Sequence, residues 1–329
     1  MTVAHAEPHP GSFPTTVEEL LARLGALHGL DAELGPARRA LTALPIVPVE
    51  TSVSLGPRSL GELRATVGVA PRADDPDGRA TLVNALSAVA ADHAVREVDE
   101  ALASVAPAAG TRRLPRGIAL RARAGDGDGV WMRPGTWVRG GAAGIADAMR
   151  RVGLDEAAAL HGRLAAQLAA NPFNAVGAYA FGVDLGASAV LGAKTYFTCE
   201  WADVALAFLR DRAAPMLDLA GADAFALLAE CVAPRNARWL LEISFELPSD
   251  PAAGVRAKAY VPARKLAASE READGKVRAL AARLDLDIAP YERLLSGMRP
   301  DGLSAARACS VMLGMSATQR HPTLEIYLS

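Results

Sequence analysis

The sequence is poor in cysteine, with only three cysteines in 329 residues. Cys199, Cys231 and Cys309 are far apart, form no C-x-x-C pair and have no histidine at the spacing of a zinc site. We therefore expect neither a disulfide framework nor a structural zinc centre. Without such a framework, a cytoplasmic location is the default expectation.

Long apolar runs are also missing. The longest uncharged stretch, residues 164–183, is interrupted by a glutamine, two asparagines and a proline, so no membrane-spanning helix is expected. Residues 1–14 have neither the basic start nor the apolar run of a signal peptide. We expect residues 1–14 to be disordered and residues 15–329 to form a single domain.

No excess of one charge is present, since 35 basic and 37 acidic side chains give a net charge of −2. This balance argues against a nucleic-acid surface built on general positive potential. Phosphate-binding loops and nucleophile elbows are absent. The aspartates at 74–77 and 126–128 have turn composition, so we expect no metal and no cofactor.

Against these absences stand five segments of alternating polar and apolar residues, each typical of two strands joined by a turn. Amphipathic helical segments at about 80–105, 144–170, 201–231 and 263–296 separate them, and another helix begins after Thr16, which has capping-box spacing to Glu19. The expected hairpins are 49–55 with 63–67, 118–123 with 130–133, 179–185 with 193–197, 241–247 with 255–261, and 310–316 with 324–328.

The hairpins repeat at a fixed period. Equivalent positions on four second strands, Arg64, Lys194, Lys258 and Glu325, are separated by 130, 64 and 67 residues, which corresponds to one repeat every 65 residues or so. The second hairpin falls where the remaining repeat belongs. The period therefore predicts five units, each with a helix pair and a hairpin, over nearly the whole chain.

Each expected hairpin has one apolar and one polar face. The apolar face requires helices against it, whereas the polar face is compatible with bulk water. An open sheet of ten similar strands would leave two edges unprotected, and closure removes them. We therefore predict an α+β fold: a ten-stranded antiparallel β-barrel of five αββα repeats, with helices outside and a ligand site in the lumen.

Lysine is scarce in this chain, yet two of its four lysines lie in similar strand triplets. Lys194 precedes Tyr196 by two residues, and Lys258 precedes Tyr260 by two residues, so each strand directs an ammonium and a phenol to the same face. Arg256 lies on that face as well. Such groups give charge-assisted hydrogen bonds to a diphosphate, and tyrosine rings stabilise a carbocation while excluding water.

These features together resemble the aromatic prenyltransferases of the ABBA barrel type. The resemblance rests on the five-unit plan, the Val49-Glu50-Thr51-Ser52 segment, Arg64 and the two basic strands. It is strongest to the dimethylallyltryptophan synthase branch, which includes bacterial indole prenyltransferases, with the cyanobactin peptide prenyltransferases similar in style. It extends over essentially the whole chain through the repeat period.

The resemblance implies an enzyme of secondary metabolism that transfers a dimethylallyl or longer prenyl group from its diphosphate to an indole-containing acceptor, without a metal. Both partners would be small molecules. Glu50 matches the family's acidic residue, which holds the indole N–H and receives charge as the ring attacks. The residues that match the diphosphate and tyrosine-shield positions are Arg64, Lys194, Tyr196, Arg256, Lys258, Tyr260 and Tyr327.

Two repeats depart from this pattern. The second has no Lys-x-Tyr triplet; its additional lumen candidates are Arg121 and Arg123 on one strand and Trp131 or Arg133 on the other. The fifth has Glu325 at the basic position, where it would repel a diphosphate unless it faces the acceptor. Three alternatives stay open: prenylation of a phenol, prenylation of a phenazine or small-peptide side chain, and a noncatalytic barrel that binds an anionic amphiphile.

Overall fold

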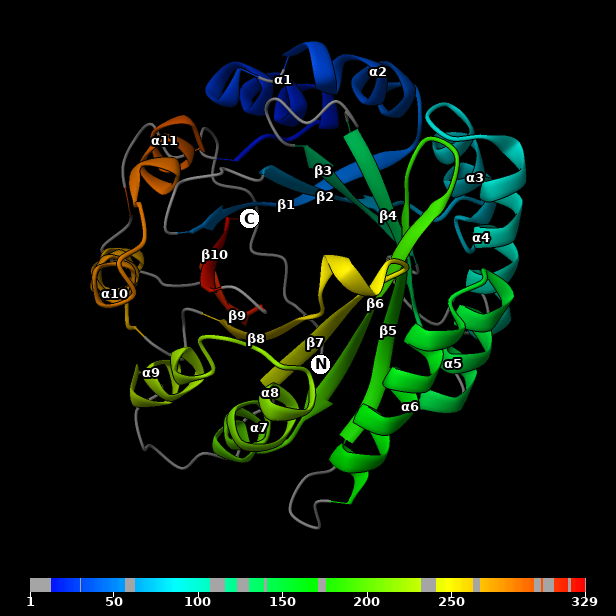
Figure 1. Cartoon of the computed structure of the whole chain (residues 1–329). Helices are drawn as coiled ribbons and strands as arrows, with labels where there is room; N and C mark the ends of the chain where they lie inside the picture. The colour runs from blue at the N-terminus through cyan, green and yellow to red at the C-terminus, as the bar shows by residue number, and fades with distance from the viewer. Residues whose placement is uncertain are drawn as a thin grey trace.

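A computed structural model gives the arrangement of the chain, and Figure 1 shows helices around a ring of strands. The structure describes residues 13–29, 31–56, 63–106, 116–122, 130–138, 141–170, 176–231, 241–262, 267–298, 303, 311–318 and 321–328. The expected disordered segment 1–14 therefore lies almost wholly outside the described residues.

Ten strands form a closed barrel, in which consecutive strands pair antiparallel and β1 pairs with β10. Because closure leaves no free sheet edge, this topology confirms the predicted barrel. The strands are β1 (Ile46–Leu55), β2 (Leu63–Val69), β3 (Arg116–Ala122), β4 (Val130–Trp137), β5 (Val176–Leu185), β6 (Val190–Cys199), β7 (Leu241–Pro248), β8 (Arg256–Pro262), β9 (Val311–Ala317) and β10 (Pro322–Leu328).

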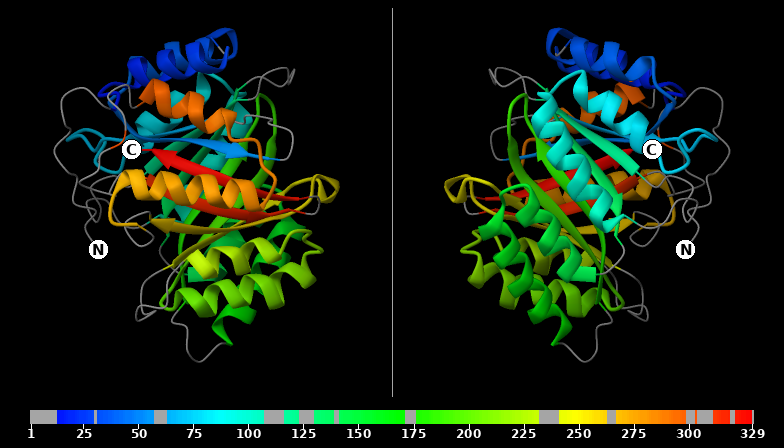
Figure 2. Two further views of the ribbon diagram at one scale, coloured as in Figure 1. Left: turned by 90° about the vertical axis from the view of Figure 1, so that its left-hand side faces the viewer. Right: turned by 90° about the vertical axis from the view of Figure 1, so that its right-hand side faces the viewer.

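A group of helices precedes each of the five hairpins, as the period predicted. Figure 2 shows that they lie outside the strands, with α10 on one side of the molecule and α4 on the opposite side. They are α1 (Val17–His28), α2 (Asp31–Thr42), α3 (Arg79–Ser87), α4 (Asp92–Val105), α5 (Gly141–Arg151), α6 (Asp155–Ala169), α7 (Ala202–Phe208), α8 (Ala214–Met216), α9 (Asp223–Cys231), α10 (Glu270–Arg283) and α11 (Ala289–Met298).

Local sequence signals account for the helix boundaries. The Thr16 hydroxyl accepts a hydrogen bond from the Glu19 amide at 3.1 Å, which caps α1 as predicted. Gly29 ends the same helix in the left-handed conformation that glycine adopts without strain. None of the helices in the described part of the chain has the length and hydropathy of a membrane span.

The apolar core lies between the barrel and the helices. Val53 and Val67 on the strands and Leu24 and Leu102 on the helices are fully buried there. Because side chains alternate along a strand, burying the apolar face on the helices turns the polar face into the lumen. This is the arrangement that the alternating pattern predicted.

Candidate active site

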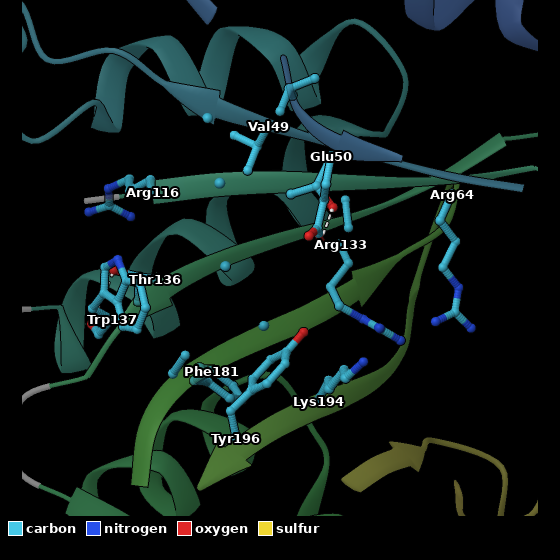
Figure 3. Close-up of a pocket in the computed structure, with 18 of the residues that line it drawn as sticks. Val49, Glu50, Arg64, Arg116, Arg133, Thr136, Trp137, Phe181, Lys194 and Tyr196 are labelled. Atoms are coloured by element: carbon cyan, nitrogen blue, oxygen red, sulfur yellow. Dashed lines mark hydrogen bonds between the residues drawn. The ribbon is translucent and has the colours of Figure 1, made fainter. Parts of the chain in front are cut away.

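The lumen contains a cavity of about 380 Å³ that reaches from a cationic end to an aromatic end. In Figure 3, Arg64, Arg133 and Lys194 lie at one end, Trp137 lies at the other, and Glu50 points into the space from the opposite wall to Tyr196. Each of the five predicted hairpins contributes at least one predicted residue to the lining of this cavity. The cavity is therefore the candidate active site.

Glu246 on β7 is the centre of the cationic end. Its carboxylate lies 3.1 Å from the Lys194 ammonium and 3.2 Å from the Arg133 guanidinium. We call the six cations within 4.0 Å of Glu246 the cation cluster; its members are Arg64, Arg121, Arg133, Lys194, Arg256 and Lys258. Four of these, Arg64, Arg121, Arg133 and Lys194, line the cavity.

Glu325 on β10 is a second anion inside the cluster. It accepts a 2.7 Å hydrogen bond from Arg64 and a short one from Lys258, and it is 1% exposed. Burial alone would raise its pKa, but Arg64 and Lys258 hold the pKa of Glu325 well below its usual range. Glu325 thus lies among the cations and is not one of the residues that line the cavity.

The cluster keeps an excess of positive charge. The third carboxylate beside it is Asp184, whose Oδ2 accepts a hydrogen bond from Arg133 at 2.9 Å. Six cations and three carboxylates among the described residues leave three positive charges in excess. Buried ions of one sign are costly, so the carboxylates make the cluster tolerable while leaving it able to take an anion.

Aromatic rings form a continuous row beside the cations. Their centroids are 5.3 Å apart for Trp137 and Tyr179, 5.8 Å for Tyr179 and Tyr196, 6.2 Å for Tyr196 and Tyr260, and 5.8 Å for Tyr260 and Tyr327. We call these five residues the aromatic row. They come from five strands, β4, β5, β6, β8 and β10, and all five line the cavity.

Each lysine of the two triplets lies between two rings of this row. The Lys194 ammonium is 5.0 Å from the Tyr196 ring and 5.4 Å from the Tyr260 ring. Lys258 is 5.4 Å from the Tyr260 ring centroid and 5.9 Å from that of Tyr327. These distances allow cation–π attraction between each lysine and the rings beside it.

Glu50 lies on β1 directly after a β-bulge between Pro48 and Glu50. Bulges re-aim side chains near functional sites, and here Glu50 lines the cavity and accepts a 3.2 Å hydrogen bond from the Thr66 hydroxyl. Removal from water raises the pKa of Glu50 to about 7, because the charged form loses hydration. Near neutral pH this carboxyl therefore exists in both protonation states.

Two further ionisable groups of the cavity have shifted pKa values. Burial lowers the pKa of Lys194 to about 8, and the neighbouring Glu246 opposes this shift. Burial also raises the pKa of Glu242 on β7, which shares a hydrogen bond with Tyr179. Perturbed pKa values grouped in one cavity are typical of catalytic sites.

The predicted residues gather as expected in most cases. The cation cluster and aromatic row bring together all seven residues assigned to the diphosphate and the tyrosine shield, and Glu50 shares their cavity. Arg121 joins the cluster, whereas Trp131 stacks under its guanidinium at 3.9 Å without lining the cavity. Arg123 lies outside the described residues.

Sequence reasoning did not assign Glu246, Glu242 or Tyr179 to the site. The signal for the two glutamates was present, because they alternate with Ser244 on the polar face of β7. Tyr179 was less accessible to prediction, since it is the extra residue of a bulge between Ala178 and Ala180. A bulge interrupts the alternation of side chains between the two faces of a strand, so the face of a bulged residue cannot be predicted from alternation.

In the described part of the chain no group of three or more histidine, cysteine, aspartate or glutamate side chains has the arrangement of a metal site. Asp75, in one of the two aspartate-rich turns, instead accepts hydrogen bonds from the amides of Ala80 and Thr81 at the start of α3. That role is structural.

Comparison with known proteins places this barrel in an established fold. No protein-family model and no curated protein sequence matches the chain. Solved structures do match: 6-dimethylallyltryptophan synthase from Micromonospora olivasterospora in complex with DMASPP and Trp superposes with a TM-score of 0.69 at 17% identity, over 95% of this chain and 96% of that one.

Two further structures agree. 5-Dimethylallyl tryptophan synthase from Streptomyces coelicolor, also in complex with DMASPP and Trp, has a TM-score of 0.69 at 19% identity over 96% of each chain. AnaPT from Neosartorya fischeri has a TM-score of 0.63 at 14% identity, over 96% of this chain and 92% of that one. At such identities the match establishes the fold, which is the ABBA prenyltransferase barrel.

Proposed function

We propose that this protein is a metal-independent aromatic prenyltransferase that moves a dimethylallyl or longer prenyl group from its diphosphate to an indole-containing acceptor. The observation that carries the proposal is the grouping of three kinds of side chain around one cavity: the cation cluster, the aromatic row beside it, and the buried carboxyl of Glu50. The ABBA barrel fold supports the same conclusion.

The cation cluster would bind the diphosphate. Four of its members line the cavity: Arg64, Arg121, Arg133 and Lys194. The other two, Arg256 and Lys258, do not line it but lie within 4.0 Å of Glu246. The three excess positive charges of the cluster attract the negatively charged diphosphate group, and guanidinium groups give paired hydrogen bonds to its oxygens. These cations also stabilise the leaving diphosphate as the C1–O bond breaks.

The aromatic row would protect the prenyl carbocation that this cleavage produces. Tyr196 and Tyr260 lie directly beside Lys194, so their ring faces adjoin the place where the diphosphate leaves. The rings attract the cation and keep water from capturing it. Burial raises the pKa of Tyr196 and Tyr260 far above neutrality, so both remain neutral phenols.

Glu50 would hold the acceptor. In its ionised form the carboxylate accepts a hydrogen bond from the indole N–H and stabilises the positive charge that develops on the ring during attack. A carbon–carbon bond then forms between the ring and C1 of the prenyl group, and the ring loses a proton to regain aromaticity. The solved relatives whose complexes contain DMASPP and Trp support this choice of partners.

The test is incubation with dimethylallyl diphosphate and a panel of indoles in the presence of a chelator, followed by mass spectrometry. The proposal expects a product heavier by one prenyl unit. Glu50→Gln is expected to abolish turnover while calorimetry still detects binding of inorganic diphosphate. Turnover that depends on an added metal would contradict metal independence.

A second function keeps the site but changes the acceptor. Glu50 has the chemistry to activate an O–H as well as an N–H, so the same panel includes a phenol, a phenazine and a tryptophan-containing peptide. Retention of the diphosphate without product from any acceptor would instead identify a barrel that binds an anionic amphiphile.

A further inference from the structure

Four glycines lie side by side on the lumen face of four neighbouring strands. Gly68 on β2 pairs with Gly117 on β3, Gly117 pairs with Gly135 on β4, and Gly135 pairs with Gly182 on β5. All four line the cavity. We call this patch the glycine wall; it faces the lumen because Gly68 and Gly117 alternate with the buried Val67 and Ile118 on their strands.

The rest of the lumen is unlike this patch. The strands β6, β8 and β10 present three tyrosines of the aromatic row to the lumen, whereas two residues next to the glycine wall, Ala119 and Ala180, are small. Three strand spacings of about 4.8 Å make the glycine wall about 14 Å wide. The wall is wider than an indole ring, although the Arg133 side chain lies against it at Gly182.

The fold itself requires only part of this wall to be glycine. A Cβ atom added to Gly135 would come within 3.2 Å of the Phe181 carbonyl oxygen, and one added to Gly182 would come within 3.0 Å of Arg133. These two glycines therefore permit close packing of β4 and β5. A Cβ atom on Gly117 would meet only the Val67 carbonyl oxygen, at an ordinary 3.5 Å.

Gly117 therefore has no packing reason to be glycine. In a strand interior glycine is unfavourable, because it loses more backbone freedom on folding than alanine and packs no side chain. A side chain at this position would project into the cavity that Thr66 and Glu50 also line, two residues along β3 from Ala119, the partner of Thr66. The absence of that side chain leaves open space in the cavity that contains Glu50.

We propose that the glycine wall is the platform on which the acceptor ring lies, and that Gly117 sets the size of acceptor admitted. The inference rests on the proposed function and extends it to a substrate class: planar aromatic acceptors with an N–H group and a fused ring system larger than indole. Peptide planes of the wall contact one ring face, Glu50 binds the N–H, and the prenyl group lies across the cavity along the aromatic row.

The experiment compares carbazole, a planar tricycle with one N–H, with indole itself. Binding of each to the wild type and to Gly117→Leu is measured by calorimetry with dimethylallyl thiolodiphosphate present, and turnover is measured with dimethylallyl diphosphate. We expect wild type to prefer carbazole and Gly117→Leu to lose about tenfold or more in carbazole affinity, with a much smaller loss for indole.

Two variants act as controls. Gly117→Ala adds the one atom that the backbone tolerates, and it is expected to give an intermediate loss in a folded protein. Gly162→Leu places the same side chain on the exposed face of α6, where nothing lies within 4 Å, and should leave both affinities unchanged. Affinity for inorganic diphosphate should stay constant throughout.

The two hypotheses fail differently. If neither Gly117 variant changes the ratio of carbazole to indole affinity, or if wild type prefers indole, the glycine wall does not select acceptors and the inference is wrong. If wild type binds carbazole on this wall but yields no prenylated product from any acceptor, the inference stands for binding and the proposed transferase function is wrong.

Discussion

At the residue scale, the burial of Glu50, the proposed acceptor-binding residue, lowers the stability of the folded protein at alkaline pH. Its pKa in the folded protein is about 7, against about 4.5 in the unfolded chain. Folding above pH 7 must therefore remove an ionised carboxylate from water. Replacement by glutamine is expected to stabilise the protein by about 1 to 3 kcal/mol at pH 8, with the gain vanishing near pH 4.5.

Chemical denaturation of wild type and Glu50→Gln at the two pH values measures this difference. Thr66→Val is the companion variant, because it removes the hydroxyl that donates to Glu50 and leaves the carboxyl in place. A glutamine variant that is no more stable than wild type at pH 8 would show that Glu50 is well hydrated in the folded state.

The pH dependence of turnover follows from two residues of the cavity. Glu50 must be ionised to hold the acceptor, so kcat/KM is expected to rise as the pH passes its pKa of about 7. Lys194 must keep its proton to bind diphosphate, so kcat/KM is expected to fall as the pH passes its pKa of about 8. The profile should be a narrow bell.

Lys194→Arg separates the two limbs, because arginine stays protonated throughout this range. The alkaline limb should disappear from the kcat/KM profile of this variant while the acid limb remains. An unchanged alkaline limb would assign it to a group other than Lys194.

Glu246 offers a third prediction, because it lies within 4.0 Å of six cations and competes with any bound anion. Glu246→Gln is expected to bind inorganic diphosphate about tenfold more tightly, since a buried charge pair is worth a few kcal/mol. Calorimetry measures the affinity. Weaker binding in this variant would mean that Glu246 positions the cations more than it repels the anion.

Counting along regular strands predicted which of these side chains share one face of the sheet. Lys194, Tyr196, Lys258 and Tyr260 were found because a spacing of two puts side chains on one strand face. Alternation with Ser244 puts Glu246 on the polar face of β7 as well, but alternation alone does not show that its carboxylate lies amid cations. Its role depends on strands that are distant in the chain.

At the scale of elements, the strands were predicted to within a few residues, whereas their irregularities were not. The bulges at Pro48–Glu50 and Ala178–Ala180 leave Val49 and Tyr179 without ladder partners. Both of these residues line the cavity. Alternation along one strand does not locate a bulge, because the lost ladder pairing is offset by tertiary contacts with other parts of the chain.

The aromatic row is a property of several strands together, and its function is tested by the fate of the prenyl group. Tyr196→Leu removes the ring between Tyr179 and Tyr260. We expect this variant to release more prenyl alcohol relative to prenylated acceptor, because water reaches the carbocation. Chromatography of both products measures the ratio.

Tyr196→Phe keeps the ring and removes only the hydroxyl. Its ratio of alcohol to prenylated acceptor should stay close to that of wild type. If the phenylalanine variant releases as much prenyl alcohol as the leucine variant, hydrogen bonding by the phenol, and not the ring face, protects the cation.

At the scale of the whole molecule, the repeat period predicted the topology correctly because every unit must bury the same apolar face against helices. Closure followed from the shared problem of the two edge strands. The residues that line each wall of the lumen could not be predicted in this way. Gly68, Gly117, Gly135 and Gly182 lie side by side only through the register of strand pairing, which the sequence of each strand does not define.

Closure also gives a prediction about stability. Ile326 on β10 is fully buried on the outer face and is paired in register with Val53 of β1, so it packs at the seam of the barrel. Ile326→Ala is expected to cost about 2 to 5 kcal/mol of unfolding free energy. Val47→Ala, at a 39% exposed position of β1, should cost much less in the same denaturation experiment.

Where β1 pairs with β10, Ser52 lies opposite Tyr327 and Ser54 lies opposite Glu325. The first and last strands of the barrel therefore meet within the proposed active site. A nascent polypeptide that still lacks its final strand has Glu50 but neither Tyr327 nor Glu325, the two residues of β10 that contact Lys258. The closed cavity therefore forms only once the final strand has been synthesised. Chains truncated before β10 are expected not to consume prenyl diphosphate.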